Sequence, residues 1–575
     1  MLFGNLIAQF SSFLSLRLGT QQVPLGVTDP AGYNALGSVI DAQFSSYVEH
    51  VLDKEEIKGI SLAVVKPGGD TEYGAWGIRT EDGEKMTSDT LFNIASCSKA
   101  FLASSVGILI DDYASGKNIT PLPAGLSRLD WDYKVEDILP GEWILQDTWA
   151  TEKANLRDIL SHVSGLPGHD GSYGPGDSPK DVVRRLRYLT PAFELREHWL
   201  YNNQMYMIGA HIISTYTGSY VKYVKHKIFD ALKMNSTTFS AREAERTGKL
   251  TQSWTAHSQR IPYWMPDDVM ELNAGPGGII TNTVDLIKWL KMLLKSGVDP
   301  VTSNSVIPRS AFEAVTTAYA IMNGKGPTPE ISINGYGMGW WRYSYQGHEV
   351  VAHSGGIPGF SSFVTFLPND DVGVAVLINT GDKGFVARNL AFKVFEKVLQ
   401  LPAGTEAKDP SKGKPDLPPR HQNSSTPLPL ESYGGTYGDA GYGSFTLCPP
   451  NGTSFYCQQV LADFKLVDNA HSDPPAPPQS IPQLFGAWER MWGSHIRLVH
   501  HEENIFNISL TSLFPNGYGA DKTPFETSEQ DQYVGHVEFV VEEGKVDGLA
   551  LFDTVPRKRR LGSVKERADA WFRKV

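Results

Sequence analysis

Hydrophobic residues near the start of the chain follow first a helical and then an extended pattern. Apolar side chains recur every three or four positions over residues 33–52, which predicts an amphipathic helix. Strand-like runs at residues 60–65 and 72–78 predict a hairpin after this helix. A short strand-like run at 91–94 then precedes residues 100–110, which are apolar nearly all round and predict a buried helix.

The middle of the chain carries mostly helical periodicity. Residues 129–170 are rich in turns and short helical segments, and further helices are predicted over 205–216 and 221–232. A glycine-rich turn at 275–278 leads into another predicted helix near 284–294. This stretch therefore predicts a mainly helical region between two strand-rich ends.

Extended patterns return after residue 348. Strands are predicted over 349–352, 361–367 and 372–379, followed by a last helix over 386–399. Strands at both ends with helices between them predict an α+β fold. We expect an antiparallel sheet that is flanked by helices and closed by chain segments remote in sequence, plus an all-helical subdomain.

The last part of the chain predicts a separate, small all-β barrel. Residues 401–429 are rich in Pro, Lys, Ser and Asn and are predicted to be a linker. Beyond them lie short alternating segments with frequent glycine, at 443–447, 496–500, 505–510, 537–541 and 548–552. The predicted organisation is an N-terminal extension (1–31), an α+β domain (32–400), the linker (401–429) and a β-barrel domain (430–575).

Composition and charge narrow the classes of partner. The 52 Lys and Arg against 64 Asp and Glu give a formal net charge of −12, which argues against nucleic acid or an anionic membrane as main partner. No stretch reaches the roughly 20 apolar residues of a membrane span, and residues 1–16 make a poor signal peptide. We expect a cytoplasmic protein; the sequence does not predict its oligomeric state.

The three cysteines cannot form a disulfide framework or a four-thiolate zinc site. Cys448 and Cys457 are close enough in sequence to bridge a hairpin in an oxidising compartment, and their bonding stays open. Cys97 is predicted to be a small buried side chain. The sequence thus predicts neither a metal site nor a cofactor.

Ser96 and Lys99 are the strongest candidates for chemistry. They stand three residues apart at the start of the predicted buried helix, so both side chains would share one helix face. The helix N-terminus supplies free amide donors where an oxyanion would form. A Ser-x-x-Lys string alone is weak evidence, because a serine that caps a helix before an exposed lysine is commoner.

A serine nucleophile also needs a base. The Lys99 ammonium cannot accept a proton, but a cation in a site without water favours a deprotonated phenol nearby. Tyr201, in the Tyr-x-Asn string that ends at Asn203 before an apolar helix, is the candidate base. Taken singly, Tyr201 as a core phenol and Asn203 as a helix cap would be the simpler interpretations.

The combination of Ser96-x-x-Lys99, Tyr201-x-Asn203 and the string that begins at His353 resembles three motifs of a known superfamily. This is the superfamily of serine β-lactamases, penicillin-binding proteins and esterases, in particular class C β-lactamases, carboxylesterases, D-aminopeptidases and fungal acyltransferases. Further segments that resemble this superfamily are residues 160–167, 277–286, 336–340 and 353–360, so the resemblance covers about residues 33–400.

The resemblance implies roles for six residues. Ser96 would be the acylated nucleophile, Lys99 the cation that tunes its proton transfer, and Tyr201 the general base that returns the proton to the leaving group. Asn203 would steady Lys99 or a substrate amide. The backbone amide of Gly356, with that of Ser96, would form the oxyanion hole. His353 would take part in substrate binding.

Two features depart from the family pattern. His353 stands where β-lactamases have Lys, and a mostly neutral imidazole is a weaker anchor for a substrate carboxylate. We therefore expect ester hydrolysis to exceed β-lactam turnover. Residues 193–200 lack the usual Pro-Gly turn before the tyrosine motif. Four nearby aromatic residues are either an acyl pocket or ordinary core: Trp199, Tyr206, Trp340 and Trp341.

The tail carries its own resemblance. Residues 430–437 and 441–443 are similar to the lipocalin-like domain of some archaeal and fungal relatives, which would cover the active-site mouth or mediate assembly.

The resemblance implies a serine hydrolase that acts on a small-molecule ester, amide or peptide through a Ser96 acyl-enzyme. Three other functions compete with this one. An acyltransferase that moves the acyl group to an alcohol or amine shares the same acyl-enzyme. A binding or scaffold protein on this fold would not need the retained Ser, Lys and Tyr. A zinc peptidase is rejected, because His348 and His353 are one residue too far apart for His-Glu-x-x-His and lie in a predicted strand.

Overall fold

The computed structural model describes residues 37–408, 425–470, 477–478, 480–527, 535–553, 557–558 and 560–575. Contacts within the chain separate Met1–Ser38 from one compact unit, Val39–Val575. The predicted N-terminal extension and most of the predicted linker lie outside the described residues, so the four predicted domain boundaries stay predictions.

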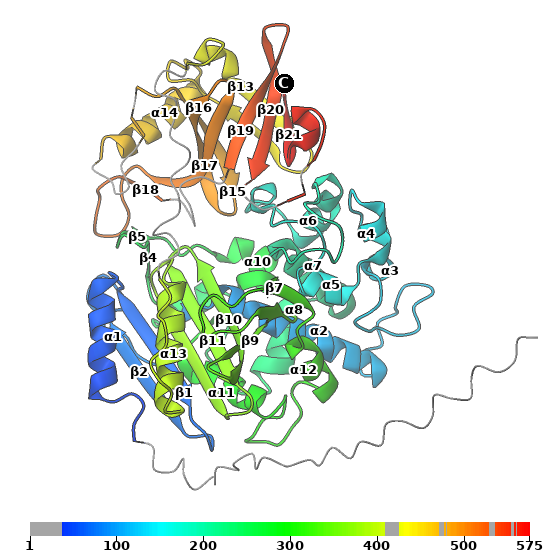
Figure 1. The fold of residues 1–575 in the computed structure, drawn as a ribbon, viewed down its shortest axis with the longest axis vertical. Coiled ribbons are helices and arrows are strands. Elements are labelled where there is room, and N and C mark those ends of the chain that lie inside the picture. The colour runs from blue at the N-terminus through cyan, green and yellow to red at the C-terminus, as the bar shows by residue number, and fades with distance from the viewer. Residues whose placement is uncertain are drawn as a thin grey trace, which may run out of the picture. The chain divides into compact units, whose positions relative to one another are not determined.

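An eight-stranded antiparallel sheet forms the centre of the first half (Figure 1). Its strand order is β2-β1-β12-β11-β10-β9-β8-β7. The strands are β1 (Gly59–Val65), β2 (Thr71–Gly77), β7 (Ala320–Asn323), β8 (Asn334–Tyr336), β9 (Trp341–Tyr345), β10 (His348–Ile357), β11 (Phe360–Leu367) and β12 (Val372–Ile378). Ile60 of β1 pairs with Ile378 of β12, which confirms that remote segments close the sheet.

Helices cover both faces of this sheet because its central strands are apolar on both sides. Successive side chains of a strand point to opposite faces of the sheet. Strands β1 and β12 are buried along their whole length, so both faces of the sheet are covered. Helices α1 (Ala42–Lys54) and α13 (Gly384–Val398) pack on one face. Helix α11 (Thr283–Leu294) packs on the other, and its Trp289 stacks on Phe101 of α2 (Ser98–Ala114) at 3.9 Å between ring centroids.

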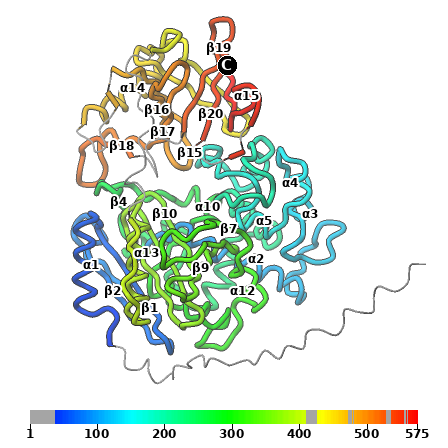
Figure 2. Tube along the Cα trace, in the orientation of Figure 1, coloured from blue at the N-terminus to red at the C-terminus, as the bar shows by residue number. Residues whose placement is uncertain are grey.

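The helical region lies on the α2 side of the sheet (Figure 2). Its helices are α3 (Val135–Ile138), α4 (Thr148–Lys153), α5 (Leu156–Leu160), α6 (Pro179–Arg185), α7 (Asn203–Thr217), α8 (Tyr220–Val224), α9 (Ala241–Arg246), α10 (Met270–Gly277) and α12 (Arg309–Thr316). Two short strand pairs join these parts: β3 (Phe92–Asn93) with β6 (Ile280–Thr281), and β4 (Ser253–Trp254) with β5 (Arg260–Ile261).

Two predicted elements of this region differ from the structure. In place of the predicted helix 221–232, the structure has the short helix α8, which ends at Val224, followed by a π-helical turn, Lys225–Phe229. The predicted glycine-rich turn is instead the end of α10, with Pro276 inside the helix. A Cβ at Gly275 would lie 2.4 Å from the Tyr206 carbonyl oxygen. Glycine there therefore serves close packing of α10 on α7 rather than a turn.

The last part of the chain folds into a nearly closed β-barrel. The strand order is β14-β13-β21-β20-β19-β17-β16-β15, and a bridge between Cys448 and Phe485 joins its two ends. The strands are β13 (Gly435–Asp439), β14 (Gly443–Leu447), β15 (Gln483–Arg490), β16 (Gly493–Glu502), β17 (Ile505–Phe514), β19 (Gly535–Glu542), β20 (Lys545–Asp553) and β21 (Ala570–Lys574), with β18 (Phe525–Thr527) beside β17. This confirms the predicted barrel.

The barrel contains features that the sequence patterns did not show. Helix α14 (Phe455–Asp468) packs on β15 and β17, and a short helix α15 (Val564–Arg567) precedes β21. A disulfide joins Cys448 to Cys457 of α14, which answers the question left open by the sequence. Because disulfides are typical of oxidising compartments, the cytoplasmic location stays a prediction. Within the described residues, no helix has the length and apolar character of a membrane span.

Candidate active site

Ser96 lies on a short turn that connects β3 to α2. The turn, Ala95–Cys97, has a 3-10 conformation, and Ala95 adopts a left-handed φ of 47°. This conformation is uncommon for a residue with a side chain, and such strain often occurs at functional sites. Asn93 holds the turn, because its Oδ1 accepts a hydrogen bond from the Ala95 amide at 2.6 Å. Ser96 remains partly exposed while its chain neighbours are buried.

Lys99 is fully buried and its Nζ meets three oxygens. The distances are 2.8 Å to Asn203 Oδ1, 2.9 Å to the Pro276 carbonyl oxygen and 3.1 Å to Ser96 Oγ. An ammonium would donate to all three. A neutral amine would donate to the two shorter contacts and accept the Ser96 proton at the longest, so the geometry serves both protonation states.

Burial lowers the pKa of the Lys99 ammonium from 10.5 to about 7, although the Asp170 carboxylate and Cys97 act in the opposite direction. Near neutral pH a large fraction of Lys99 is therefore uncharged. This corrects the premise that Lys99 is always an ammonium, because desolvation outweighs the charge of the Asp170 carboxylate. Lys99 itself becomes a candidate base.

Tyr201 lies beside the other two residues, as the sequence predicted. Its ring centroid is 4.7 Å from Lys99 Nζ. Burial raises the pKa of Tyr201 well above 10.0, and the polar Ser96 side chain nearby only partly offsets this effect. The phenol thus keeps its proton near neutral pH, which favours a proton donor rather than the phenolate base expected from the sequence.

Asn203 begins helix α7 and faces Lys99. The neighbouring Asn202, not Asn203, caps the helix by accepting from the Met205 amide. This leaves the Asn203 side chain free to accept from Lys99 at 2.8 Å. Its Nδ2 atom points the other way and lies 3.4 Å from Asp170 Oδ1.

His353 is buried and both of its ring nitrogens have partners. Its Nδ1 lies 2.6 Å from the Ser354 carbonyl oxygen, so Nδ1 carries the proton, and Nε2 accepts from the Tyr336 hydroxyl at 3.1 Å. Burial, with the Lys99 charge, lowers the pKa of His353 to about 3. The structure therefore places a neutral imidazole on strand β10, with both ring nitrogens engaged and none left for a substrate carboxylate.

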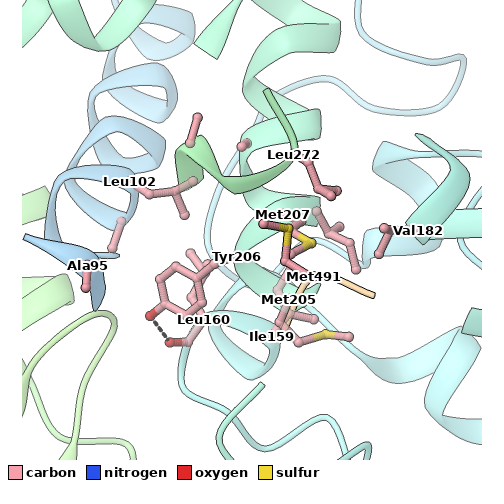
Figure 3. Close-up of a cluster of buried hydrophobic side chains, with 14 of the residues drawn as sticks. Ala95, Leu102, Ile159, Leu160, Val182, Met205, Tyr206, Met207, Leu272 and Met491 are labelled. Carbon is pink, nitrogen blue, oxygen red and sulfur yellow. Dashed lines mark hydrogen bonds between the residues drawn. The ribbon is translucent and has the colours of Figure 1, made fainter. Parts of the chain in front are cut away.

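The predicted aromatic pocket is largely ordinary core. Tyr206 and Trp340 are fully buried, and Tyr206 donates to the Leu160 carbonyl oxygen at 2.6 Å (Figure 3). Trp341 stacks on His353, and Trp199 lies beside Tyr201, and both are only partly buried.

Strand β10 brings two glycines next to the serine turn. A Cβ at Gly355 would lie 2.2 Å from the Ile94 carbonyl oxygen, so only glycine allows the strand to approach this closely. Gly356 is exposed and a Cβ there would meet nothing within 4 Å. Cys97 holds the same junction, because its buried thiol donates to the His353 carbonyl oxygen at 3.2 Å.

Sequence reasoning missed Asp170 and Tyr173, which lie behind Asn203. The Tyr173 hydroxyl donates to Asp170 Oδ1 at 2.5 Å. Both residues follow the matching segment 160–167 directly, and that proximity was the only available signal. Among the described residues, no group of three or more His, Cys, Asp or Glu is placed to hold a metal ion.

The Ser96 hydroxyl lies between an amine and a protonated phenol, at the start of a buried helix and beside a strand edge. This arrangement is typical of serine enzymes that transfer acyl groups. Comparison of sequences agrees with this class. The Beta-lactamase family model matches residues 44–398, and the chain belongs to this family of serine hydrolases. The resemblance predicted from the motifs is thereby confirmed.

Named relatives are fungal and bacterial. An unguisins hydrolase of Aspergillus campestris is 30% identical over 377 residues, which cover 64% of this chain and 66% of that protein. An unguisins hydrolase of Aspergillus violaceofuscus is 28% identical over 449 residues, 71% of this chain and 76% of that protein. The match thus spans just under two thirds of the first relative's length.

A solved structure matches nearly the whole fold. The octameric penicillin-binding protein homologue from Pyrococcus abyssi is 20% identical with a TM-score of 0.52, and the match covers 89% of this chain and 98% of that one. The likeness therefore extends from the catalytic part into the barrel.

Proposed function

We propose that the protein hydrolyses an ester or amide bond of a small molecule through an acyl-enzyme on Ser96. The observation that carries this proposal is the convergence of Ser96, Lys99 and Tyr201, which come from separate elements and meet at one partly exposed hydroxyl. The names of the fungal relatives make unguisins a donor to test first.

Acylation would proceed with neutral Lys99 as the base. Ser96 Oγ attacks the carbonyl carbon while its proton passes to Lys99 Nζ, 3.1 Å away. The backbone amides of Ser96 and Gly356 stabilise the oxyanion. When the bond to the leaving group breaks, Tyr201 gives that group its proton, and Lys99 then returns a proton to Tyr201. The amine and the phenol thus regain their starting states.

Deacylation repeats these steps with water, an alcohol or an amine as the incoming nucleophile. Water as acceptor gives hydrolysis, and an alcohol or amine as acceptor gives the acyltransferase alternative. Asn203 keeps Lys99 in place through both halves of the reaction, because its Oδ1 accepts from Nζ whether the amine is charged or neutral. His353 acts indirectly, by fixing strand β10, rather than by binding substrate.

Covalent labelling tests the proposal. A fluorophosphonate probe should label the wild type and not Ser96→Ala. Ser104→Ala is the matched control, because that buried serine lies on α2, the helix that follows Ser96, and away from Lys99. Intact-mass screening of acyl donors, with and without added alcohols and amines, then identifies the acyl group and the acceptor. A wild type that does not label supports a binding or scaffold protein instead.

A further inference from the structure

The turn between strands β15 and β16 of the barrel lies against the catalytic part of the chain. The Met491 amide donates to the Tyr173 carbonyl oxygen at 3.2 Å. The Trp492 indole Nε1 donates to the Tyr173 hydroxyl at 3.1 Å. Figure 3 shows Met491 among the hydrophobic side chains of α7 and α10, and its Sδ accepts from Asn273 Nδ2 at 3.2 Å. The barrel thus reaches the residues that stand behind the active site.

A continuous series of hydrogen bonds leads from this turn to Lys99. Trp492 donates to Tyr173, Tyr173 donates to Asp170 Oδ1 at 2.5 Å, and Asn203 Nδ2 approaches the same oxygen at 3.4 Å. The Asn203 side-chain oxygen Oδ1 then accepts from Lys99 Nζ at 2.8 Å. Each link is a direct hydrogen bond between side chains, and none of them needs a water molecule.

We propose that Trp492 is a positioning residue for Lys99, so that the barrel forms part of the catalytic machinery. The inference rests on the proposed function. It follows from the direction of each hydrogen bond. An indole only donates, so the Tyr173 oxygen accepts from Trp492 and must use its one hydrogen on Asp170. A carboxylate only accepts, so it draws the Asn203 amide group toward itself. The Asn203 side-chain oxygen Oδ1 is thereby turned toward Lys99.

The surroundings of Lys99 show why this orientation matters. The titratable groups that face it are Cys97, His162, Asp170, Tyr201, Tyr206 and His353. Burial raises the pKa of the Cys97 thiol to about 12 and lowers the pKa of both histidines, so these three are neutral near pH 7. Burial also keeps the two phenols protonated. Asp170 therefore supplies the negative charge that opposes desolvation of the ammonium.

A purely structural role for Trp492 is the competing explanation. Its ring packs on Trp264 with centroids 4.5 Å apart, and loss of that contact would loosen the docking of the barrel. Trp492→Phe separates the two roles, because it keeps an aromatic ring and removes the N–H donor. Trp488→Phe is the matched control. It lies on the same hairpin, and its indole Nε1 has no hydrogen-bond partner in the described part of the chain.

The experiment measures fluorophosphonate labelling rates of the full chain from pH 5.5 to 9.5. Trp492→Phe should slow labelling about fivefold, as expected for one lost hydrogen bond. It should also shift the acidic side of the pH–rate profile to lower pH, because the Asp170 charge moves away from Lys99 and the pKa of Lys99 falls. Tyr173→Phe should do the same. The double variant should be no slower than Tyr173→Phe alone, because both act through one series of contacts. Trp488→Phe should match the wild type.

Other results would overturn the inference. A Trp492→Phe profile equal to that of the wild type excludes a positioning role. If Trp492→Phe slows labelling by the same factor in the wild type and in Tyr173→Phe, its effect comes from lost packing on Trp264. If Trp492→Phe fails to fold, Tyr173→Phe decides alone, and an unchanged pH profile there refutes the inference. A wild type that does not label refutes the proposed function instead, so the two failures are distinguishable.

Discussion

Acylation of Ser96 should depend on pH through Lys99. Burial lowers the pKa of the lysine to about 7, and only the neutral amine accepts the serine proton. The charged form is the inactive one, so activity is present above this pKa and is lost as the pH falls through it. A lysine with the ordinary value of 10.5 would leave the enzyme almost wholly inactive at neutral pH.

The expected magnitude follows from the titration curve. With a pKa of about 7, about half of Lys99 is neutral at pH 7, about a tenth at pH 6 and nearly all at pH 9. The labelling rate should therefore rise about tenfold from pH 6 to pH 9 and be level at the upper end. His162 and His353 do not contribute, because burial lowers the pKa of His353 to about 3 and that of His162 well below 6.5.

The assay is fluorophosphonate labelling at fixed ionic strength, with circular dichroism at each pH to establish that the protein stays folded. Lys99→Arg is the control, because a guanidinium cannot give up its proton, and labelling should fall about 10³-fold. A rate that still rises about tenfold per pH unit at pH 9 would refute the reasoning. Such a profile would return the base to Tyr201, whose pKa burial raises.

Three further outcomes are expected. Tyr201→Phe should lower kcat/KM about 10²-fold for an amide and much less for a p-nitrophenyl ester, whose leaving group needs no proton; equal losses in a steady-state assay would exclude the proton-donor role. Gly355→Ala should lower the free energy of unfolding by about 1–3 kcal/mol, because its Cβ would meet the Ile94 carbonyl oxygen, whereas Gly356→Ala should unfold like the wild type in urea. Cys448→Ser should lower the free energy of unfolding of the barrel by about 2–3 kcal/mol, because the disulfide to Cys457 closes a short loop. A melting temperature equal to that of the non-reduced wild type would contradict this.

Much of the fold could be predicted because hydrophobic periodicity is a local signal. The predicted strands at 60–65 and 372–379 correspond to β1 and β12, and the five predicted barrel strands are all present. Helix α14 was missed because its pattern lies between a predicted strand and a proline-rich stretch. The end of α10 was missed because glycine and proline predict a turn locally, while close packing on α7 decides the conformation.

Only those residues of the site that belong to sequence motifs could be predicted. Ser96, Lys99 and Tyr201 lie together as expected, and their roles stay proposals. The protonation states could not be read from the sequence, because they depend on burial. Asp170 and Trp492 could not be found either, since they join Lys99 through contacts between segments more than 30 residues apart.

Mapping an acyl adduct tests the central claim most directly. Brief incubation with a p-nitrophenyl ester, acid quench and peptide mass mapping should place one acyl group on the hydroxyl of Ser96, and Ser96→Ala should carry none. An adduct on another residue, or ester turnover by Ser96→Ala at the wild-type rate, would contradict the account.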